Sequence, residues 1–344
     1  MKVLSLFDGI SGCRQALKEL NIDCEYYASE IDKYAIQVAK ANHSDIIHIG
    51  DVKNLFKYHH FNDGRYNQFY NIARGNFDLL IGGSPCQDLS IAKKDRKGLQ
   101  GDRSSLFYEY LRILNETKPK YFILENVASM SKESQEIITK ELFNIEPIMI
   151  NSALVTAQNR KRLYWVGELI NGEYKQVRIE QPRDKEIYLK DIIEEEVDEK
   201  YYISEKALKT YTSNGKIKNL KELDEKTCCL TATTHKGFGN DGYTVIRVGQ
   251  FNKGGQGDRV YSEEGKSVCL SANGGGRGAK TGLYKIDLPD GEYKVRKLTP
   301  TECCRLQGFP DDYVSMVSNT QGYKGLGNSF TVPVIKHLIQ SIIK

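Results

Sequence analysis

The chain has 344 residues, 40% of them hydrophobic, and a formal net charge of +4, which permits a polyanionic partner without demanding one. No apolar run approaches the ~20 residues that span a bilayer, and Asp8 interrupts the first run too early for a signal peptide, so we expect a cytoplasmic protein with no membrane partner. The eight cysteines have no C-x-x-C spacing, which argues against a zinc site or a disulfide framework and favours reduced thiols.

The first elements predict a strand, a glycine-bearing turn and a helix. Residues 2–6 form an apolar run, residues 7–12 contain the pattern F-x-G-x-x-G, and the helix ends near Leu20. Glycines in such a turn let the backbone approach a ligand beside a helix N-terminus. This pattern alone is compatible with a turn that binds no ligand and with a dinucleotide-binding site, although the dinucleotide fingerprint G-x-G-x-x-G is absent.

Two further strands have acidic residues at their ends. The run 25–29 ends in Glu30, where a carboxylate can accept hydrogen bonds from a ribose. The run 46–49 is followed by Asp51 and Val52, which could accept from an adenine amino group and pack on the adenine ring. Taken separately, each acid could be a solvated residue at a strand end, but their joint placement favours a nucleoside-containing cofactor.

The loop 82–87 holds the candidate nucleophile. It follows a short apolar run, and a buried strand that breaks at paired glycines displays the side chains that come next. Pro85 fixes the approach to Cys86, although an isolated cysteine at a strand end is more often a small buried thiol. A second strand-like run, 121–124, ends in the carboxyl group of Glu125, which favours a catalytic interpretation.

Three motifs in this order resemble the catalytic signatures of the cytosine-5 DNA methyltransferases. They are Pro85-Cys86-Gln87, Glu125-Asn126-Val127 and Gln158-Asn159-Arg160-Lys161-Arg162. The resemblance covers the chain apart from a middle segment. It implies an α/β fold, with a doubly wound, mostly parallel Rossmann-like methyltransferase sheet and a smaller β-rich target recognition domain.

The expected organisation has three parts. Residues 1–175 form a catalytic domain that binds S-adenosylmethionine, residues 176–294 form the target recognition domain, and residues 295–344 return to complete the catalytic domain. The middle part contains an acidic stretch, residues 184–200, which reads as a solvated connector or helix.

The middle part also contains an internal repeat. Residues 226–232 align with residues 266–272 at a constant offset of 40, and each copy runs into a glycine-rich loop. Two similar units of strand plus loop predict two loops that face one surface. Two ordinary hairpins with flexible tips are the alternative.

The C-terminal part begins with a helix signal. Thr299, Pro300 and Glu302 predict a helix N-cap followed by proline in the first turn. Cys303 and Cys304 are then core residues of that helix and not catalysts.

The resemblance implies a role for each catalytic residue. Cys86 would attack carbon 6 of cytosine, Glu125 would donate a proton to N3, and Arg162 would bind the 2-oxo group, with Arg160 supporting Arg162 or Glu125. Carbon 5 would then take the methyl group of S-adenosyl-L-methionine, leaving S-adenosyl-L-homocysteine. In duplex DNA the target base must first be flipped out of the stack.

The resemblance also implies the binding residues. At the cofactor we expect residues from strand ends, the glycine turn and the closing motif: Phe7, Gly9, Gly12, Glu30, Ile31, Asp51, Val52, Pro85, Leu106, Asn328 and Ser329. At DNA we expect residues of the loop after Cys86 and of the recognition domain: Ser90, Arg103, Lys236, Asn240, Asn273, Arg277 and Lys280. No metal is expected.

We therefore predict a DNA (cytosine-5)-methyltransferase of the small prokaryotic or phage type, acting on a specific sequence of double-stranded DNA. A tRNA cytosine-5 methyltransferase is the alternative, because one branch of the family keeps the same catalytic motifs. A catalytically silent DNA-binding regulator is a third. A cognate restriction endonuclease would be a functional partner, and a monomer is sufficient because each chain flips one base.

Overall fold

The structure is a computed structural model that describes residues 1–55, 76–84, 106–203, 247–250, 258–272, 278, 280–287 and 293–343. The chain divides into two compact units. Unit 1 comprises Met1–Ile150, Lys161–Pro182 and Val332–Lys344, and unit 2 comprises Asn151–Arg160 and Arg183–Thr331. The C-terminal segment is thus shared: residues 295–331 belong to unit 2, and residues 332–344 belong to unit 1.

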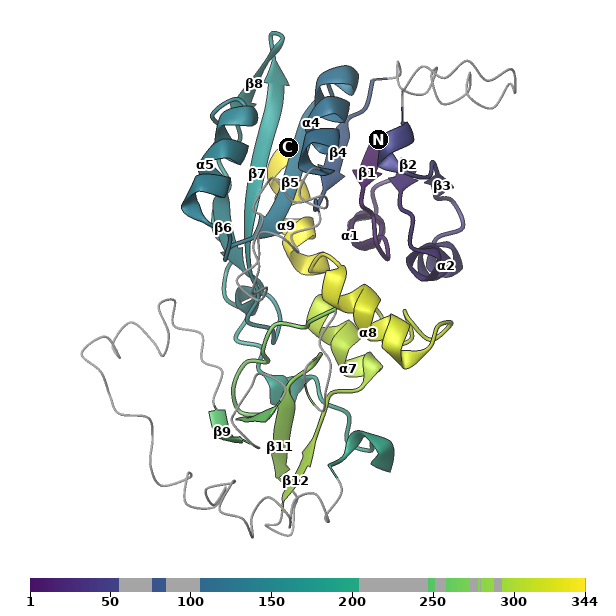
Figure 1. The fold of residues 1–344 in the computed structure, drawn as a ribbon, viewed down its shortest axis with the longest axis vertical. Coiled ribbons are helices and arrows are strands. Elements are labelled where there is room, and N and C mark those ends of the chain that lie inside the picture. Colours follow the sequence, from purple (N-terminus) through teal and green to yellow (C-terminus); the bar gives the residue numbers. More distant parts are fainter. Residues whose placement is uncertain are drawn as a thin grey trace, which may run out of the picture. The chain divides into compact units, whose positions relative to one another are not determined.

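Unit 1 is built on a sheet with the strand order β3-β2-β1-β4-β5-β7-β6, and β8 pairs with β7 (Figure 1). The strands are β1 (Lys2–Leu6), β2 (Glu25–Ser29), β3 (Ile47–His48), β4 (Leu79–Gly82), β5 (Tyr121–Val127), β6 (Ile148–Asn151), β7 (Lys161–Ile170) and β8 (Glu173–Gln176). Strands β1 to β5 pair with one another in parallel, whereas β7 is antiparallel to both β5 and β8. The predicted mostly parallel sheet is confirmed.

The helices of unit 1 are α1 (Gly12–Glu19), α2 (Lys33–Asn42), α4 (Leu106–Thr117), α5 (Lys132–Glu141) and α9 (Val332–Ile342), with a 3-10 turn, η1, at Val52–Asn54. Helix α4 shows why they form: Phe107, Tyr110 and Leu114 recur at helical spacing and are buried. Burying each such side chain contributes about 1.5–3 kcal/mol. Helix α9 brings the C-terminus back to α1, where Lys336 forms an ion pair with Glu19 at 2.8 Å.

One strand end differs from the expectation. Glu125 was expected to follow a strand that ends at residue 124, but β5 continues through Val127. The reason is its partner β7, which pairs with β5 along its whole length, from Tyr121 opposite Glu168 to Val127 opposite Arg162.

Unit 2 contains a four-stranded sheet with the order β12-β11-β10-β9. The strands of this sheet are β9 (Arg247–Gln250), β10 (Arg259–Ser262), β11 (Leu283–Asp287) and β12 (Tyr293–Arg296). The described helices of unit 2 are α7 (Pro300–Gln307) and α8 (Asn319–Asn328). The unit also contains the 3-10 turns η3 (Ser152–Leu154), η4 (Leu189–Asp191) and η5 (Glu199–Tyr201). Residues 184–200 form a mostly exposed connector with two 3-10 turns, η4 and η5, and not the helix that was the other expectation. Leu189 and Lys190 of η4 donate backbone hydrogen bonds to Gly265 and Glu263.

The expected strand in the second copy of the repeat is wrong. Residues 266–272 form no strand and make one isolated bridge, between Ser267 and Gln158. The backbone of this segment pairs with the loop 151–160 and with Lys280, so its hydrogen bonds are satisfied outside the sheet. The first copy, residues 226–232, lies outside the described residues.

The predicted start of α7 is confirmed. The Thr299 hydroxyl accepts from the Glu302 N–H at 3.1 Å, the Glu302 carboxylate accepts from the Thr299 N–H at 2.8 Å, and Pro300 occupies the first helical position. Cys303 and Cys304 are fully buried, and burial raises the pKa of the Cys304 thiol to about 12. These thiols are core residues, as expected.

Candidate active site

The loop after β1 adopts a backbone that needs support. Phe7, Gly9 and Ser11 have φ angles of 57°, 60° and 63°, and two of these residues carry side chains that the left-handed region disfavours. The buried Asp8 carboxylate supports the turn by accepting hydrogen bonds from the Ser11 hydroxyl and, at 2.7 Å, from the Tyr26 hydroxyl. Burial raises the pKa of Asp8 to about 6.

Glu30, at the end of β2, holds the same loop from a second direction. Its Oε2 accepts from the Gly9 N–H at 2.8 Å, and its Oε1 accepts from the N–H groups of Ile31 at 2.7 Å and Asp32 at 2.8 Å. A carboxylate held by three backbone donors is preorganised, and it still has lone pairs for further donors such as ribose hydroxyls. Ile31 is 73% exposed and offers apolar surface beside Glu30.

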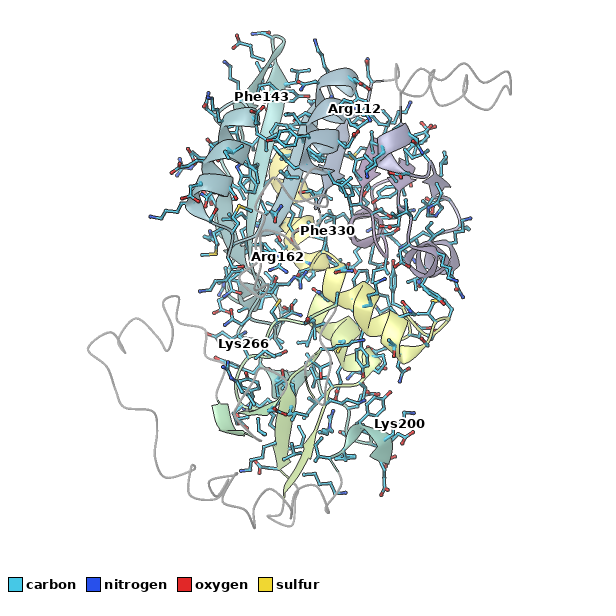
Figure 2. The ribbon with its side chains drawn as sticks, in the orientation of Figure 1. Arg112, Phe143, Arg162, Lys200, Lys266 and Phe330 are labelled. Carbon is cyan, nitrogen blue, oxygen red and sulfur yellow. The ribbon has the colours of Figure 1, made fainter. Side chains whose placement is uncertain are left out.

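The remaining cofactor candidates of unit 1 lie at η1 and α4. Asp51 caps η1, its Oδ1 accepting from the Lys53 N–H at 2.9 Å. Val52 is buried, and its carbonyl accepts from Arg112 Nη2 of α4 at 3.1 Å (Arg112 is labelled in Figure 2). Leu106 and Phe7 are partly buried and pack against the core of unit 1, while Gly12 begins α1.

Glu125 and Arg162 form an ion pair inside unit 1. Arg162 Nε lies 2.9 Å from Glu125 Oε1, and both side chains are mostly buried. Glu125 is opposite Tyr164 across β5 and β7, and Arg162 is two residues before Tyr164, so the pair is diagonal on one face of the sheet. The Arg162 guanidinium also donates to the Lys161 carbonyl at 2.9 Å.

Asn126 connects β5 to the segment that leads toward Cys86. Its Nδ2 donates to Ser84 Oγ at 3.2 Å, and its Oδ1 accepts from the Val127 N–H at 2.8 Å. Ser84 is two positions before Cys86 in the chain, so this buried contact holds the last described residue before Cys86 beside β5. Several predicted site residues lie outside the described residues: Pro85, Cys86, Ser90, Arg103, Lys236, Asn240, Asn273 and Arg277.

Arg160 lies in unit 2 and its contacts differ from those expected. Support of Arg162 or Glu125 was predicted, but the Arg160 guanidinium donates to the carbonyls of Gly327 at 3.2 Å and Ser329 at 2.9 Å. Arg160 is buried, so these carbonyls replace water as its partners. The structure therefore links Arg160 to the closing motif.

The closing motif is held by further buried polar contacts. Gln307 Nε2 donates to the Leu326 carbonyl at 2.6 Å, and Gln307 Oε1 accepts from the Thr331 hydroxyl at 2.9 Å. Asn328 is exposed between these anchors, whereas Ser329 is buried. A fixed backbone with one exposed amide side chain suits a contact to a ligand. Of the residues expected to bind DNA, Lys280 is the one that the structure describes. Its side chain is partly buried, and its backbone carbonyl accepts from the Ser271 N–H.

Sequence reasoning missed three residues that support these loops: Asp8, Tyr26 and Arg112. The partners of Tyr26 and Arg112 are 18 and 60 residues away, so no local pattern reveals them.

Among the described residues, no group of three or more potential metal ligands occurs, and none of the described helices combines the length and apolar character needed to cross a membrane.

Comparisons with known proteins identify the family. The model of the family described as "C-5 cytosine-specific DNA methylase" matches residues 1–344. Type II methyltransferase M.HhaI of Haemophilus parahaemolyticus is 29% identical over 351 residues, covering 99% of this chain and 94% of the relative. Type II methyltransferase M1.ScrFI of Lactococcus lactis subsp. cremoris is 32% identical over 354 residues, covering 100% of this chain and 78% of the relative.

Solved structures agree on the fold. The methyltransferase EhMeth of Entamoeba histolytica superposes with a TM-score of 0.66 at 19% identity, covering 99% of this chain and 97% of that chain. Because the family model spans the whole sequence, the chain belongs to the C-5 cytosine-specific DNA methylases and is a DNA cytosine methyltransferase.

Proposed function

We propose that this protein methylates carbon 5 of a flipped-out cytosine in a specific duplex DNA sequence, through a covalent adduct of Cys86 at carbon 6. The observation that carries the proposal is the Glu125–Arg162 pair, which combines a carboxyl group and a guanidinium on one face of the sheet at 2.9 Å. Asn126, next to Glu125, bonds to Ser84, and the chain reaches Cys86 two residues later.

The pair matches the N3 and 2-oxo edge of cytosine. This edge presents two adjacent acceptors, so it needs two donors. Arg162 would donate to the 2-oxo group, and Glu125, carrying a proton, would donate to N3. Cys86 would add its thiolate sulfur to carbon 6, and protonation at N3 would take up the displaced electron pair. The resulting enamine makes carbon 5 nucleophilic. After methylation, loss of the carbon 5 proton expels the Cys86 thiolate.

S-Adenosyl-L-methionine would supply the electrophilic methyl group. The described residues fit it: Glu30 keeps lone pairs for ribose hydroxyls, and Ile31 offers exposed apolar surface for the adenine. The positive φ of Gly9 brings an unencumbered backbone to the same place. Asp51 would accept from the adenine amino group. Asn328 and Ser329 would complete the methionine end.

DNA recognition would fall to the recognition domain and to the loop after Cys86. Flipping the base costs a few kcal/mol, and phosphate contacts from basic side chains offset this cost. The names of the relatives, type II methyltransferases, support a role beside a restriction endonuclease that cleaves the same sequence. One target base per turnover makes a monomer sufficient.

The test is expression in a host that lacks cytosine-5 methylation, followed by genome sequencing with a method that separates methylated from unmodified cytosine. Methylation confined to one short motif is the expected result. Cys86→Ser should abolish it, whereas Cys24→Ser, at a half-buried free thiol of unit 1, should not. Methylation that persists in Cys86→Ser would refute the covalent mechanism. Methyl transfer to RNA but not to duplex DNA would favour the tRNA alternative.

A further inference from the structure

Residues 151–160, which carry Arg160, form a closed loop in unit 2. Where the two ends of the loop meet, the Ser152 N–H donates to the Arg160 carbonyl at 2.9 Å, and the Arg160 N–H donates to Asn151 Oδ1 at 3.0 Å. Asn151 Nδ2 also donates to Asn159 Oδ1 at 3.1 Å. Arg160 lies where the two ends of the loop meet, and β7, which carries Arg162, begins at the next residue, Lys161.

The ammonium group of Lys266 binds this loop from inside the protein. Its Nζ donates to the carbonyls of Ala153 at 2.8 Å and Thr156 at 3.4 Å, both in the loop, and to the carbonyl of Ile187. The side chain, labelled in Figure 2, is only 2% exposed. An ammonium group has three donors, and the carbonyl oxygens match them in number.

The residues that follow Lys266 extend this contact. The Ser267 N–H donates to the Ala157 carbonyl at 2.7 Å, and the Asn159 N–H donates to the Ser267 carbonyl at 2.9 Å. Cys269 Sγ then accepts from Arg160 Nη1 at 3.5 Å. One short segment of the expected recognition domain is thus bonded to the loop at its middle and at Arg160.

This packing leaves no room for a side chain at Gly327 of the closing motif. A Cβ atom at Gly327 would lie 2.6 Å from the backbone nitrogen of Ala272. The Gly327 carbonyl is also an acceptor for Arg160. Segment 266–272 therefore contacts both of the backbone regions that hold Arg160, and a shift of this segment must shift them as well.

We propose that Lys266 is a positioning residue for methyl transfer: its ammonium fixes the loop 151–160 and thereby sets Arg160 and Arg162 in place for the flipped base. The inference rests on the proposed function. Without the ammonium, the buried carbonyls of Ala153 and Thr156 lose a charged partner, and the loop must rearrange to reach water or other donors. Catalysis should then suffer more than cofactor binding.

The experiment compares Lys266→Met with Lys200→Met. Methionine keeps the length and apolar stem of lysine but removes the charge. Lys200 is the matched control, since its side chain is 60% exposed and it pairs with Asp198 at 2.7 Å on the surface of the same unit. We expect the single-turnover rate on an unmethylated duplex that carries the recognition motif to fall about tenfold or more in Lys266→Met. The KM of Lys266→Met for S-adenosyl-L-methionine and the single-turnover rate of Lys200→Met should both stay at wild-type values.

Two further measurements separate positioning from a loss of stability. In Lys266→Met, the Asn159 amide should exchange its hydrogen faster, while amides of β1 and β5 remain protected. In Lys266→Ala, propylammonium should restore part of the rate, whereas propanol, which has the same size and no charge, should not. If Lys266→Met fails to fold, the rate is measured on Lys266→Arg, whose planar guanidinium keeps the charge but not the threefold geometry, and a slower rate at unchanged KM supports the proposal.

A wild-type single-turnover rate in the folded Lys266→Met variant, or in Lys266→Arg as its replacement, would overturn the positioning role. Failure of the wild-type chain to methylate DNA would instead refute the proposed function. The two failures are therefore distinguishable.

Discussion

Arg296 and Glu302 form a fully buried, bidentate ion pair in unit 2, with Nη1 2.7 Å from Oε2 and Nη2 2.6 Å from Oε1. The Glu302 carboxylate also accepts from the backbone N–H groups of Thr299 and Glu194. The pair therefore joins the last residue of β12 to the cap of α7 and to the acidic stretch before η5. Each oxygen of the carboxylate has two donors, so burial leaves neither charge uncompensated.

Removing one member of this pair should destabilise the protein strongly. Arg296→Met leaves the Glu302 charge buried without its partner, and we expect a loss of about 3–5 kcal/mol in the free energy of unfolding. Arg305→Met, which breaks the more exposed pair with Asp311, should cost less than about 1 kcal/mol. Urea unfolding of both variants measures the difference. Equal losses would show that burial of the pair does not matter.

Asp8 should make stability depend on pH. Its pKa in the folded protein is about 6, against an ordinary value of 3.8, because burial disfavours the charged form. A raised pKa means that the stabilisation from this group is fully present below pH 3.8 and is lost as the pH rises through 6. Asp8→Asn removes the titration but keeps a partner for the Ser11 and Tyr26 hydroxyls.

The variant Asp8→Asn should therefore gain stability relative to wild type between pH 4 and pH 8, by at most about 3 kcal/mol. Urea unfolding of both proteins across this range measures the change, and other titrating groups cancel in the comparison. A difference that is independent of pH would contradict the assignment of this titration to Asp8.

The sequence predicts those features that depend on neighbouring residues. The strand at residues 2–6 and the cap at Thr299 follow from local apolar spacing and capping chemistry, and the structure confirms them. The direction of β7 does not follow, because alternating strands and helices give the order of elements and not the sense of the last pairing. The buried contacts of Lys266 could not be predicted from the sequence either, because its acceptor Ala153 is 113 residues away and a lysine is ordinarily a surface residue.

Gly327 should not tolerate even a methyl group. The added Cβ in Gly327→Ala would lie 2.6 Å from the Ala272 backbone nitrogen and 2.8 Å from the Ser271 carbonyl carbon, and these backbone atoms cannot move aside as a flexible side chain could. We expect a loss of about 1–3 kcal/mol in stability from this overpacking. Gly172→Ala is the control for a different effect, because that site has open space but a φ of 84°. If thermal unfolding shows no loss for Gly327→Ala, segment 266–272 is not packed against the closing motif as described.

Glu125→Gln should separate catalysis from folding. Glutamine keeps the shape and can still accept from Arg162, but it cannot deliver a proton to N3 of the base. We expect the rate of methyl transfer to fall by about 10²–10⁴-fold, while the loss of a mostly buried ion pair lowers stability. Glu173→Gln, which breaks an exposed pair with Lys175 in the same unit, controls for the removal of a carboxylate and should leave the rate unchanged.

The effects of Glu125→Gln on stability and on the rate of methyl transfer together identify the role of the Glu125–Arg162 pair. A variant that melts at lower temperature but methylates at the wild-type rate when folded would make the Glu125–Arg162 pair a structural contact between β5 and β7. A slow rate in a folded protein, with the affinity for S-adenosyl-L-methionine preserved, is the result expected if Glu125 acts on the base. Because a general acid acts in the transition state and not on cofactor binding, only the second pattern agrees with the proposed chemistry.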